Sequence, residues 1–256
     1  MTSTDSPPAS KPTFRSTLLG LRSAQKPGRG APPYSRWINR RLGRYFAAAA
    51  YLLGLTPDQV TIISACFTYS SLVLLMVLPP TWWLGILIAL LLVIGYALDS
   101  ADGQLARLRG GGSKSGEWLD HIVDATKIGV MHSAVLVSFY RFSQERSYVL
   151  IVPLVFMVAS FVFFFGMMLT DQLRRAAATA AGQSYSKPSG PGGAFQTIVA
   201  IPTDYGLLCL VFVLLGAHVV FVVVYALLAL AQLLITAGVL VRWWRELRRM
   251  DAAARA

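Results

Sequence analysis

Apolar residues fall into six long runs that short polar segments separate. The runs cover about residues 59–78, 83–105, 118–140, 149–169, 197–215 and 217–241. A helix needs roughly 20 apolar residues to cross a hydrocarbon core of about 30 Å, so each run suffices for one transmembrane helix. The pattern therefore predicts an all-α integral membrane protein with six transmembrane helices.

The segments around these runs predict the domain organisation. Residues 1–33 are polar and rich in proline, which predicts a disordered tail without a secretory signal. Residues 34–54 mix arginines with aromatic and aliphatic residues, as an amphipathic helix in the membrane interface does. The six-helix domain then covers residues 55–245, and residues 246–256 form a cytoplasmic tail.

The first transmembrane helix has a specific start signal. Gly54 is placed to end the preceding helix, and Thr56 is followed by Pro57 at the first helical position. Gln59 stands three residues after Thr56, which predicts a capping box. We therefore expect this helix to begin near residue 57.

Charge predicts the orientation and excludes one class of partner. Lys and Arg gather before the first run, between the second and third, between the fourth and fifth, and after the sixth. By the positive-inside rule both termini are then cytoplasmic, and the cell membrane is the expected location. The basic residues are not interleaved with aromatics as a nucleic-acid groove requires, so the net charge of +11 suits contact with membrane lipids instead.

Carboxylates are concentrated where the second and third runs meet. Five of the twelve acidic residues lie between Asp99 and Asp124. An Asp inside a membrane helix costs about 2.5 to 3.5 kcal/mol on insertion scales, so such acids usually face a polar cavity with a positive partner. Asp99 and Asp102 are three apart, and Asp120 and Asp124 are four apart, so each pair shares a helix face.

An antiparallel pair of helices would bring these four carboxylates together at the cytoplasmic side. Oxygen ligands favour Mg²⁺ or Mn²⁺, and no Cys or suitably spaced His joins the pattern. Two divalent ions would neutralise four carboxylates, and two-metal sites stabilise the attacking and leaving oxygens of a phosphoryl displacement. The sequence thus predicts a metal site formed by Asp99, Asp102, Asp120 and Asp124.

The same residues carry a family resemblance. The pattern Asp99-x2-Asp102-Gly103-x2-Ala106-Arg107-x8-Gly116-x3-Asp120-x3-Asp124 resembles the complete motif of the CDP-alcohol phosphotransferases. Residues 54–61 and the glycine-rich turn ending at Ser113 are similar to the phosphatidylinositol-phosphate synthases of that family.

This resemblance implies an activity and an assembly. It implies a homodimer that transfers a phosphatidyl group from a CDP-linked donor, CDP-diacylglycerol in the first place, to an alcohol acceptor in phospholipid biosynthesis, with release of CMP. Asp124 is then the general base as well as a metal ligand. The implied nucleotide or donor contacts are Asp58, Gln59, Val60, Thr61, Gly103, Ala106, Arg107, Ser113 and Gly116.

The acceptor is the least determined part of the site. Candidate acceptor residues are Lys127, Arg174 and Arg175, although basic residues at these places also suit headgroup contacts. His121 and His132 are interpreted as packing residues rather than ligands. The absence of an arginine cluster disfavours an inositol phosphate acceptor.

Two other functions remain open from the sequence. One is CDP-choline or CDP-ethanolamine type transfer to a lipid hydroxyl, because the Asp120-His121-x2-Asp124 spelling is similar to that branch. The other is a divalent-cation transporter whose intramembrane acids form the ion path. Release of CMP would distinguish an enzyme from a transporter.

Overall fold

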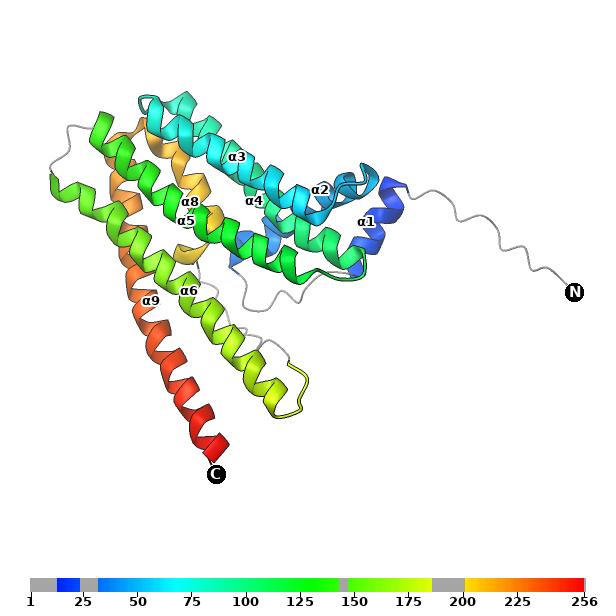
Figure 1. The fold of residues 1–256 in the computed structure, drawn as a ribbon. Coiled ribbons are helices and arrows are strands. Elements are labelled where there is room, and N and C mark those ends of the chain that lie inside the picture. The colour runs from blue at the N-terminus through cyan, green and yellow to red at the C-terminus, as the bar shows by residue number, and fades with distance from the viewer. Residues whose placement is uncertain (1–12, 24–31, 143–146, 186–200, 256) are drawn as a thin grey trace, which may run out of the picture.

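The computed structural model describes residues 13–23, 32–142, 147–185 and 201–255, and over these ranges it is helical without strands. The main helices are α1 (Phe14–Ser23), α2 (Arg40–Leu52), α3 (Pro57–Val77), α4 (Trp82–Leu108), α5 (Lys114–Phe142), α6 (Ile151–Ala180), α8 (Tyr205–Val211) and α9 (His218–Arg255). Short 3-10 or π segments, η1 (Ser35–Asn39), η2 (Ser147–Leu150), η3 (Ile201–Thr203) and η4 (Phe212–Gly216), flank them. Helices α3, α4 and α5 run alongside one another, while α6 and α9 extend together beyond them (Figure 1).

Five of these helices are long and apolar enough to cross a membrane, namely α3, α4, α5, the η2–α6 segment and α9. The expected integral membrane class is therefore confirmed. The fifth predicted run is different, because its described part forms only the short apolar stretch Tyr205–Gly216. At 1.5 Å per residue this stretch is well short of a hydrocarbon core, so six full-length spans are not observed. Residues 197–200 of that run lie outside the described part.

The helix α1 lies inside the segment for which the sequence predicts disorder. Leu21 is fully buried, and Leu18 packs against the same apolar cluster, which α2, α3 and α4 also build. Two leucines one turn apart thus dock residues 14–23 onto the membrane domain as a helix, where the sequence predicts a disordered tail. The remainder of the predicted tail, apart from residues 13, 32 and 33, is outside the described residues.

The connection between α2 and α3 forms as the sequence predicts. Gly54 has φ of +73°, and the amides of Gly54 and Leu55 donate to the carbonyls of Tyr51 and Ala50. This pairing is the Schellman motif that closes α2. The Thr56 hydroxyl then accepts from the Gln59 amide at 3.2 Å, while the Gln59 side chain accepts from the Thr56 amide at 2.9 Å. The expected capping box is therefore confirmed.

α4 is the central helix, and small residues allow its neighbours to approach closely. A Cβ on Gly95 would lie 2.6 Å from the Thr68 hydroxyl of α3, and one on Gly43 would lie 2.9 Å from Ser100 of α4. Close backbone approach through small residues is the common way in which membrane helices pack. It fixes α2 and α3 against the end of α4 that carries Asp99 and Asp102.

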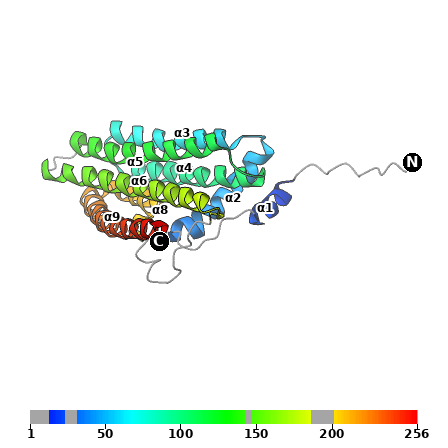
Figure 2. The same ribbon diagram turned by 60° about the horizontal axis from the view of Figure 1, so that its bottom comes forward.

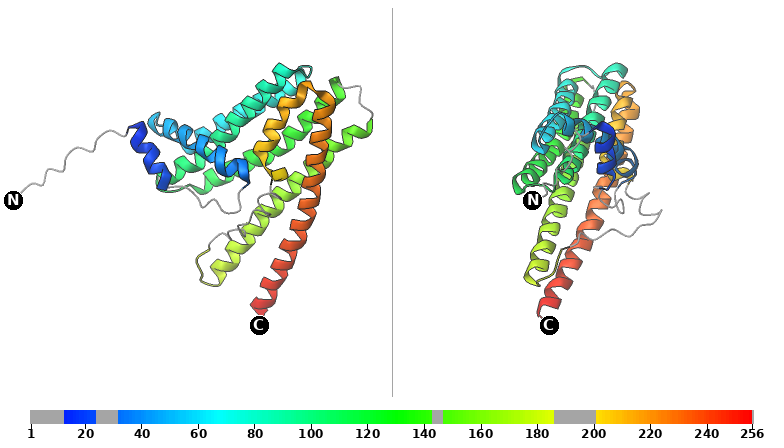
Figure 3. Two further views of the ribbon diagram at one scale, coloured as in Figure 1. Left: turned by 180° about the vertical axis from the view of Figure 1, so that it is seen from behind. Right: turned by 90° about the vertical axis from the view of Figure 1, so that its right-hand side faces the viewer.

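The apolar core lies at the other end of the bundle, between α3, α4, α5, η4 and α9. Its largest fully buried side chains include Phe139, Phe212, Phe221 and Tyr225, whose rings form edge-to-face, tilted and stacked contacts. Figure 2 and Figure 3 show α8 and the first half of α9 lying against this bundle, while the second half of α9 runs out beside α6. The polar site therefore lies at the end of the bundle away from this core.

Candidate functional site

The turn between α4 and α5 determines where the four aspartates lie. Gly110 and Gly111 have φ of 96° and 134°, and their amides donate to the carbonyls of Arg107 and Ala106. The Ser113 hydroxyl accepts from the Gly116 amide at 2.9 Å, which caps the start of α5. The chain thus reverses within a few residues, and the acids at the end of α4 and the start of α5 lie at the same end of the bundle (Figure 1).

α5 packs mainly on α3 and α6, whereas α4 packs on α2 and α3. The sequence predicts that the two acid-bearing helices pack on each other, but in the structure both pack mainly on α3. Side chains bridge the space between them. The Lys127 ammonium contacts both Asp99 of α4 and Asp124 of α5, and Asp102 and Asp120 lie within about one turn of these two residues, so the four acids form one cluster.

Asp102 is the most enclosed of the four acids, with 6% of its surface exposed. The Thr61 hydroxyl of α3 donates to its Oδ2 at 2.6 Å, and the Gly103 amide lies 2.5 Å from its Oδ1. Two donors from two helices therefore fix the orientation of this carboxylate. Thr61 occupies this place because its position in the second turn of α3 faces α4.

Lys127 lies within the aspartate cluster. Its ammonium forms a very short ion pair with Asp99 and lies 3.4 Å from Asp124 Oδ1 and 3.2 Å from the Ser64 hydroxyl. The Lys127 side chain is only 6% exposed. Its three donors are directed at these groups, so in this structure Lys127 neutralises acids rather than standing free for an acceptor.

The side open to solvent is formed by α5. Ligand atoms of Asp120, His121 and Asp124 all lie within 4.8 Å of one another, and the carboxylates of Asp120 and Asp124 are 37% and 32% exposed. The structure therefore brings a histidine beside the acids where the sequence predicts none, because His121 Nδ1 also lies 3.9 Å from Asp120 Oδ2. His121 directly follows Asp120 in the chain and stands three residues before Asp124. This i to i+3 spacing is the sequence signal that places the ring on the same side of α5 as Asp124.

The donor set fits hard divalent cations. The four carboxylates offer oxygen ligands from two helices. Two hydrogen-bond donors hold Asp102 in place, and Asp120 and Asp124 are partly exposed. Oxygen-rich sites of this kind suit Mg²⁺ or Mn²⁺, and the His121 imidazole adds a nitrogen that also accepts Mn²⁺ or Zn²⁺.

The predicted nucleotide contacts separate into three groups. Asp58, Ser113 and Gly116 are gathered where α3 and α5 begin, because a Cβ on Gly116 would lie 3.0 Å from both Asp58 Oδ1 and Ser113 Oγ. Thr61 holds Asp102, and Gly103, Ala106 and Arg107 lie partly exposed along the last turns of α4. Gln59 and Val60 point elsewhere.

The side chain of Gln59 closes the capping box, and Val60 is 1% exposed within the cluster that docks α1 and α2. Both residues therefore shape the start of α3 in this structure, and neither side chain faces the acids. The family resemblance implies nucleotide contacts along the whole segment that contains these two residues. A helix, however, presents only some of its positions to one site.

The two arginines proposed for the acceptor are engaged in ion pairs. Arg174 binds Glu246 through two parallel hydrogen bonds of 2.9 and 2.7 Å, which join α6 to α9. Arg175 pairs with Asp171 at 3.0 Å and with Glu117 at 3.1 Å. Glu246 and Glu117 lie far away in the sequence on other helices, so the charge pattern alone does not reveal these two pairs, whereas Asp171 stands four residues before Arg175 on α6 at a spacing that the sequence shows.

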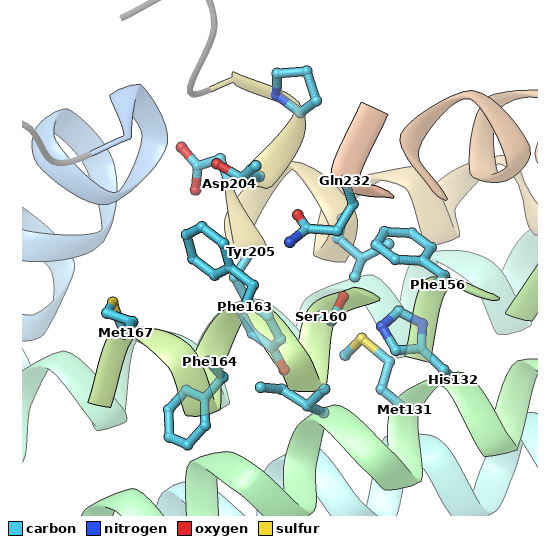
Figure 4. Close-up of a pocket in the computed structure, with 14 residues that line it drawn as sticks. Met131, His132, Phe156, Ser160, Phe163, Phe164, Met167, Asp204, Tyr205 and Gln232 are labelled. Atoms are coloured by element: carbon cyan, nitrogen blue, oxygen red, sulfur yellow. The ribbon is translucent and has the colours of Figure 1, made fainter. Parts of the chain in front are cut away.

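A cavity of about 160 Å³ lies between α5, α6, η3, α8 and α9. Its walls are largely apolar, and its polar residues are His132, Ser160, Thr203, Asp204, Tyr205 and Gln232 (Figure 4). His132 Nδ1 lies 2.6 Å from the Tyr225 hydroxyl, so this histidine is a packed residue as the sequence predicts.

Asp204 ties the edge of this cavity to the N-terminal segment. Its carboxylate accepts from the Tyr34 amide at 2.7 Å and from the Gly206 amide at 3.1 Å. Burial raises the pKa of the Asp204 carboxyl, while donation from the amides of Tyr34, Gly206 and Ser35 opposes that rise. Neither Asp204 nor Tyr205 is singled out by the sequence, because both stand in an apolar run without a motif.

Comparison with known proteins agrees with the chemistry of this site. The chain is 35% identical over 83 residues to a phosphatidylinositol phosphate synthase of Corynebacterium glutamicum and 32% identical over 129 residues to one of Mycobacteroides abscessus. These alignments cover 32% and 49% of this chain, and 36% and 55% of the relatives. The chain thus spans about a third to a half of the curated relatives it matches.

Two crystal structures of the Mycobacterium tuberculosis phosphatidylinositol phosphate synthase resemble the fold. The form with CDP-DAG bound matches with a TM-score of 0.51 at 24% identity, covering 81% of this chain and 94% of the other. The form with manganese and citrate matches with a TM-score of 0.50 at 25% identity, covering 81% and 89%. The CDP-alcohol phosphatidyltransferase model matches residues 54–244, and the chain belongs to this family of transferases.

Proposed function

We propose that this protein transfers the phosphatidyl group of CDP-diacylglycerol to the hydroxyl of an alcohol and releases CMP. The observation that carries this proposal is the cluster of Asp99, Asp102, Asp120 and Asp124, in which Lys127 joins acids from two helices. Family membership supports the reaction class, and a structural relative with CDP-DAG bound supports the donor.

The aspartates would hold two divalent ions, Mg²⁺ or Mn²⁺, and manganese is present in one structural relative. Such ions supply positive charge to the bridging phosphates of the donor and stabilise the leaving oxygen. Asp102 is suited to a fixed ligand because Thr61 and Gly103 already orient it. The partly exposed Asp120 and Asp124 offer oxygens on the open side.

Asp124 is the proposed general base. It is the acid of the cluster that lies deepest along α5 while remaining 32% exposed, and Lys127 lies 3.4 Å from it as a counter-charge. Its carboxylate would take the proton of the acceptor hydroxyl. The acceptor oxygen then bonds to the phosphorus that carries the diacylglycerol, and the bond from that phosphorus to the oxygen of CMP breaks.

The nucleotide is proposed to lie over the starts of α3 and α5. Asp58, Ser113 and Gly116 meet there, and Arg107 on α4 provides a guanidinium whose fork suits phosphate oxygens. Gly116 leaves room that a side chain would fill. Gln59 and Val60 would act only by forming the start of α3.

The active site and both termini are proposed to face the cytoplasm of a cell-membrane protein. α3 to α6, α8 and α9 alternate in direction, so that the end of α2 and the end of α9 fall on the same side as the α4–α5 turn (Figure 1). Arginines of α2, the α4–α5 turn and the end of α9 gather on this side. A homodimer remains part of the proposal.

The direct test is CMP release by purified protein with Mg²⁺ and either CDP-diacylglycerol or CDP-choline. Release from CDP-diacylglycerol with a water-soluble alcohol would support the proposal. Release only from CDP-choline with diacylglycerol would indicate a soluble CDP-alcohol donor and a lipid acceptor. Release from neither donor would contradict the proposed transferase activity.

A further inference from the structure

Lys127 lies at a position where three helices meet inside the aspartate cluster. It follows Asp124 by three residues on α5, and its ammonium pairs with Asp99 of α4 and with Asp124 itself. The same ammonium lies 3.2 Å from the hydroxyl of Ser64 on α3. That hydroxyl donates to the Gly95 carbonyl at 2.8 Å, so its oxygen can accept from the lysine. The three helices thus form a site for one monovalent cation, and the lysine fills it.

Burial holds the ammonium at this position. Only 6% of the Lys127 side chain and 19% of the Asp99 side chain are exposed. A buried charge is costly unless it is paired, so Lys127 remains with the acids as long as no stronger cation takes them. The family pattern of aspartates ends at Asp124 and does not include Lys127, so this cation is a feature of the individual chain.

Asp99 and Asp124 are also two of the four proposed metal ligands. Mg²⁺ requires oxygen ligands at roughly 2.0 to 2.1 Å in near-octahedral geometry, whereas these two carboxylates are directed at an ammonium. Two cations that lie close together also repel each other. A divalent ion that uses both of these acids must therefore displace the Lys127 ammonium.

The other two acids are placed differently. Among the described residues, neither Asp102 nor Asp120 forms an ion pair with Lys127. A divalent ion held by Asp102 and Asp120 would therefore leave the lysine in place. One such ion together with the ammonium brings the four carboxylates close to neutrality. A second ion makes the cluster positive until the phosphates of the donor bring negative charge.

We propose that Lys127 competes with divalent metal for Asp99 and Asp124, so that the two metal ions bind unequally. The site holds one ion tightly without substrate, and it binds the second tightly only when the donor phosphates are present. Lys127 is then a positioning residue that couples metal loading to donor binding. This inference rests on the metal site of the proposed function and specifies how that site is filled.

Unequal loading is tested on purified wild-type protein by titration with Mn²⁺, with free Mn²⁺ measured by EPR. Without nucleotide, one ion should bind tightly and the second at least tenfold more weakly. Adding CDP as a soluble diphosphate should strengthen the second ion at least tenfold, after correction for the Mn²⁺ that CDP binds in buffer alone. Equal affinity for both ions without CDP, or no gain with CDP, would overturn the inference.

Lys127→Met tests the lysine itself. Without the competing ammonium, the second ion should bind at least tenfold more tightly than in wild type in the absence of CDP, and should gain more than the first ion. A residue that only supports the fold would instead weaken metal binding when it is replaced. Lys127→Arg keeps the positive charge and should retain the weak second ion. Lys114→Met, at the exposed first position of α5, is the matched control and should bind both ions as wild type does.

An unchanged or weaker second ion in Lys127→Met would refute the competition. If this variant does not fold, the wild-type titration with and without CDP still decides the matter. CMP release by wild type separates this failure from a failure of the proposed function. If CMP is released but both ions bind equally, the inference about Lys127 fails alone. If wild type binds no Mn²⁺ and releases no CMP, the proposed function fails as well.

Discussion

Thr61 and Asp102 are joined by a hydrogen bond of 2.6 Å that links the second turn of α3 to the acid-bearing end of α4. The carboxylate accepts this bond in an environment where only 6% of the residue is exposed. Hydrogen bonds to charged groups contribute about 1.5 to 3 kcal/mol, so this contact is a substantial part of the local structure.

Thr61→Val should therefore lower stability by about 2 kcal/mol and weaken Mg²⁺-dependent donor binding. The valine keeps the shape of the side chain but leaves one Asp102 oxygen without its donor. Thr61→Ser retains the hydroxyl and should restore most of both properties. Thermal unfolding with and without Mg²⁺ measures the effect, and equal behaviour of the Val and Ser variants would show that the hydroxyl is unimportant.

Lys127→Met should make the protein strongly dependent on divalent metal for its stability. Lys127 is the cation between Asp99 and Asp124, and removing one partner of a buried pair costs about 3 to 5 kcal/mol. A bound divalent ion can supply the missing charge. In EDTA the variant should unfold at a much lower temperature than wild type, and Mg²⁺ should raise its Tm by more than it raises that of wild type.

Lys114→Met is the control for this change, because Lys114 is exposed at the first position of the same helix. It should behave like wild type in both buffers. If Lys127→Met were as stable as wild type in EDTA, the acids would not need this counter-charge.

Gly116→Ala should weaken donor binding by roughly three- to tenfold, because active-site shifts of a fraction of an ångström are costly. The added methyl would lie 3.0 Å from Asp58 Oδ1 and from Ser113 Oγ, so both must move. Gly129→Ala on the same helix meets nothing within 4 Å and should bind donor normally. Donor affinity is measured with labelled CDP-diacylglycerol. Equal affinity of the two variants would contradict a nucleotide site at the starts of α3 and α5.

Arg174→Gln should affect stability and not the acceptor. Its two hydrogen bonds to Glu246 join α6 to α9, and because both side chains are partly exposed we expect a loss of about 1 kcal/mol. Glu246→Gln should cost a similar amount, and the double variant should cost less than the sum. A rise in acceptor KM for Arg174→Gln, with stability unchanged, would instead assign Arg174 to the acceptor.

Much of the local structure follows from the sequence, because its signals are local. The Thr56 capping box and the end of α2 at Gly54 form as predicted. The spacing of Asp99 to Asp102 and of Asp120 to Asp124 is enough to place each pair on one helix face, and a short turn brings the pairs to the same end.

The differences arise from contacts between residues that are far apart in the chain. Lys127 meets Asp99 across 28 residues, and Arg174 meets Glu246 across 72, so neither pairing has a local signal. The short helix at Tyr205 occupies an apolar run that by hydropathy alone is indistinguishable from a full span. The docking of α1 likewise depends on a site for Leu21 that only the folded domain provides.

The central claim is that the aspartate cluster binds the donor through metal and that Asp124 removes the acceptor proton. Asp124→Asn separates these functions, and single-turnover CMP release together with equilibrium binding of CDP-diacylglycerol in Mg²⁺ measures both. We predict that CMP release falls by about 10² to 10⁴ while donor affinity stays within a few-fold of wild type. Wild-type CMP release by Asp124→Asn would contradict the assignment of the base.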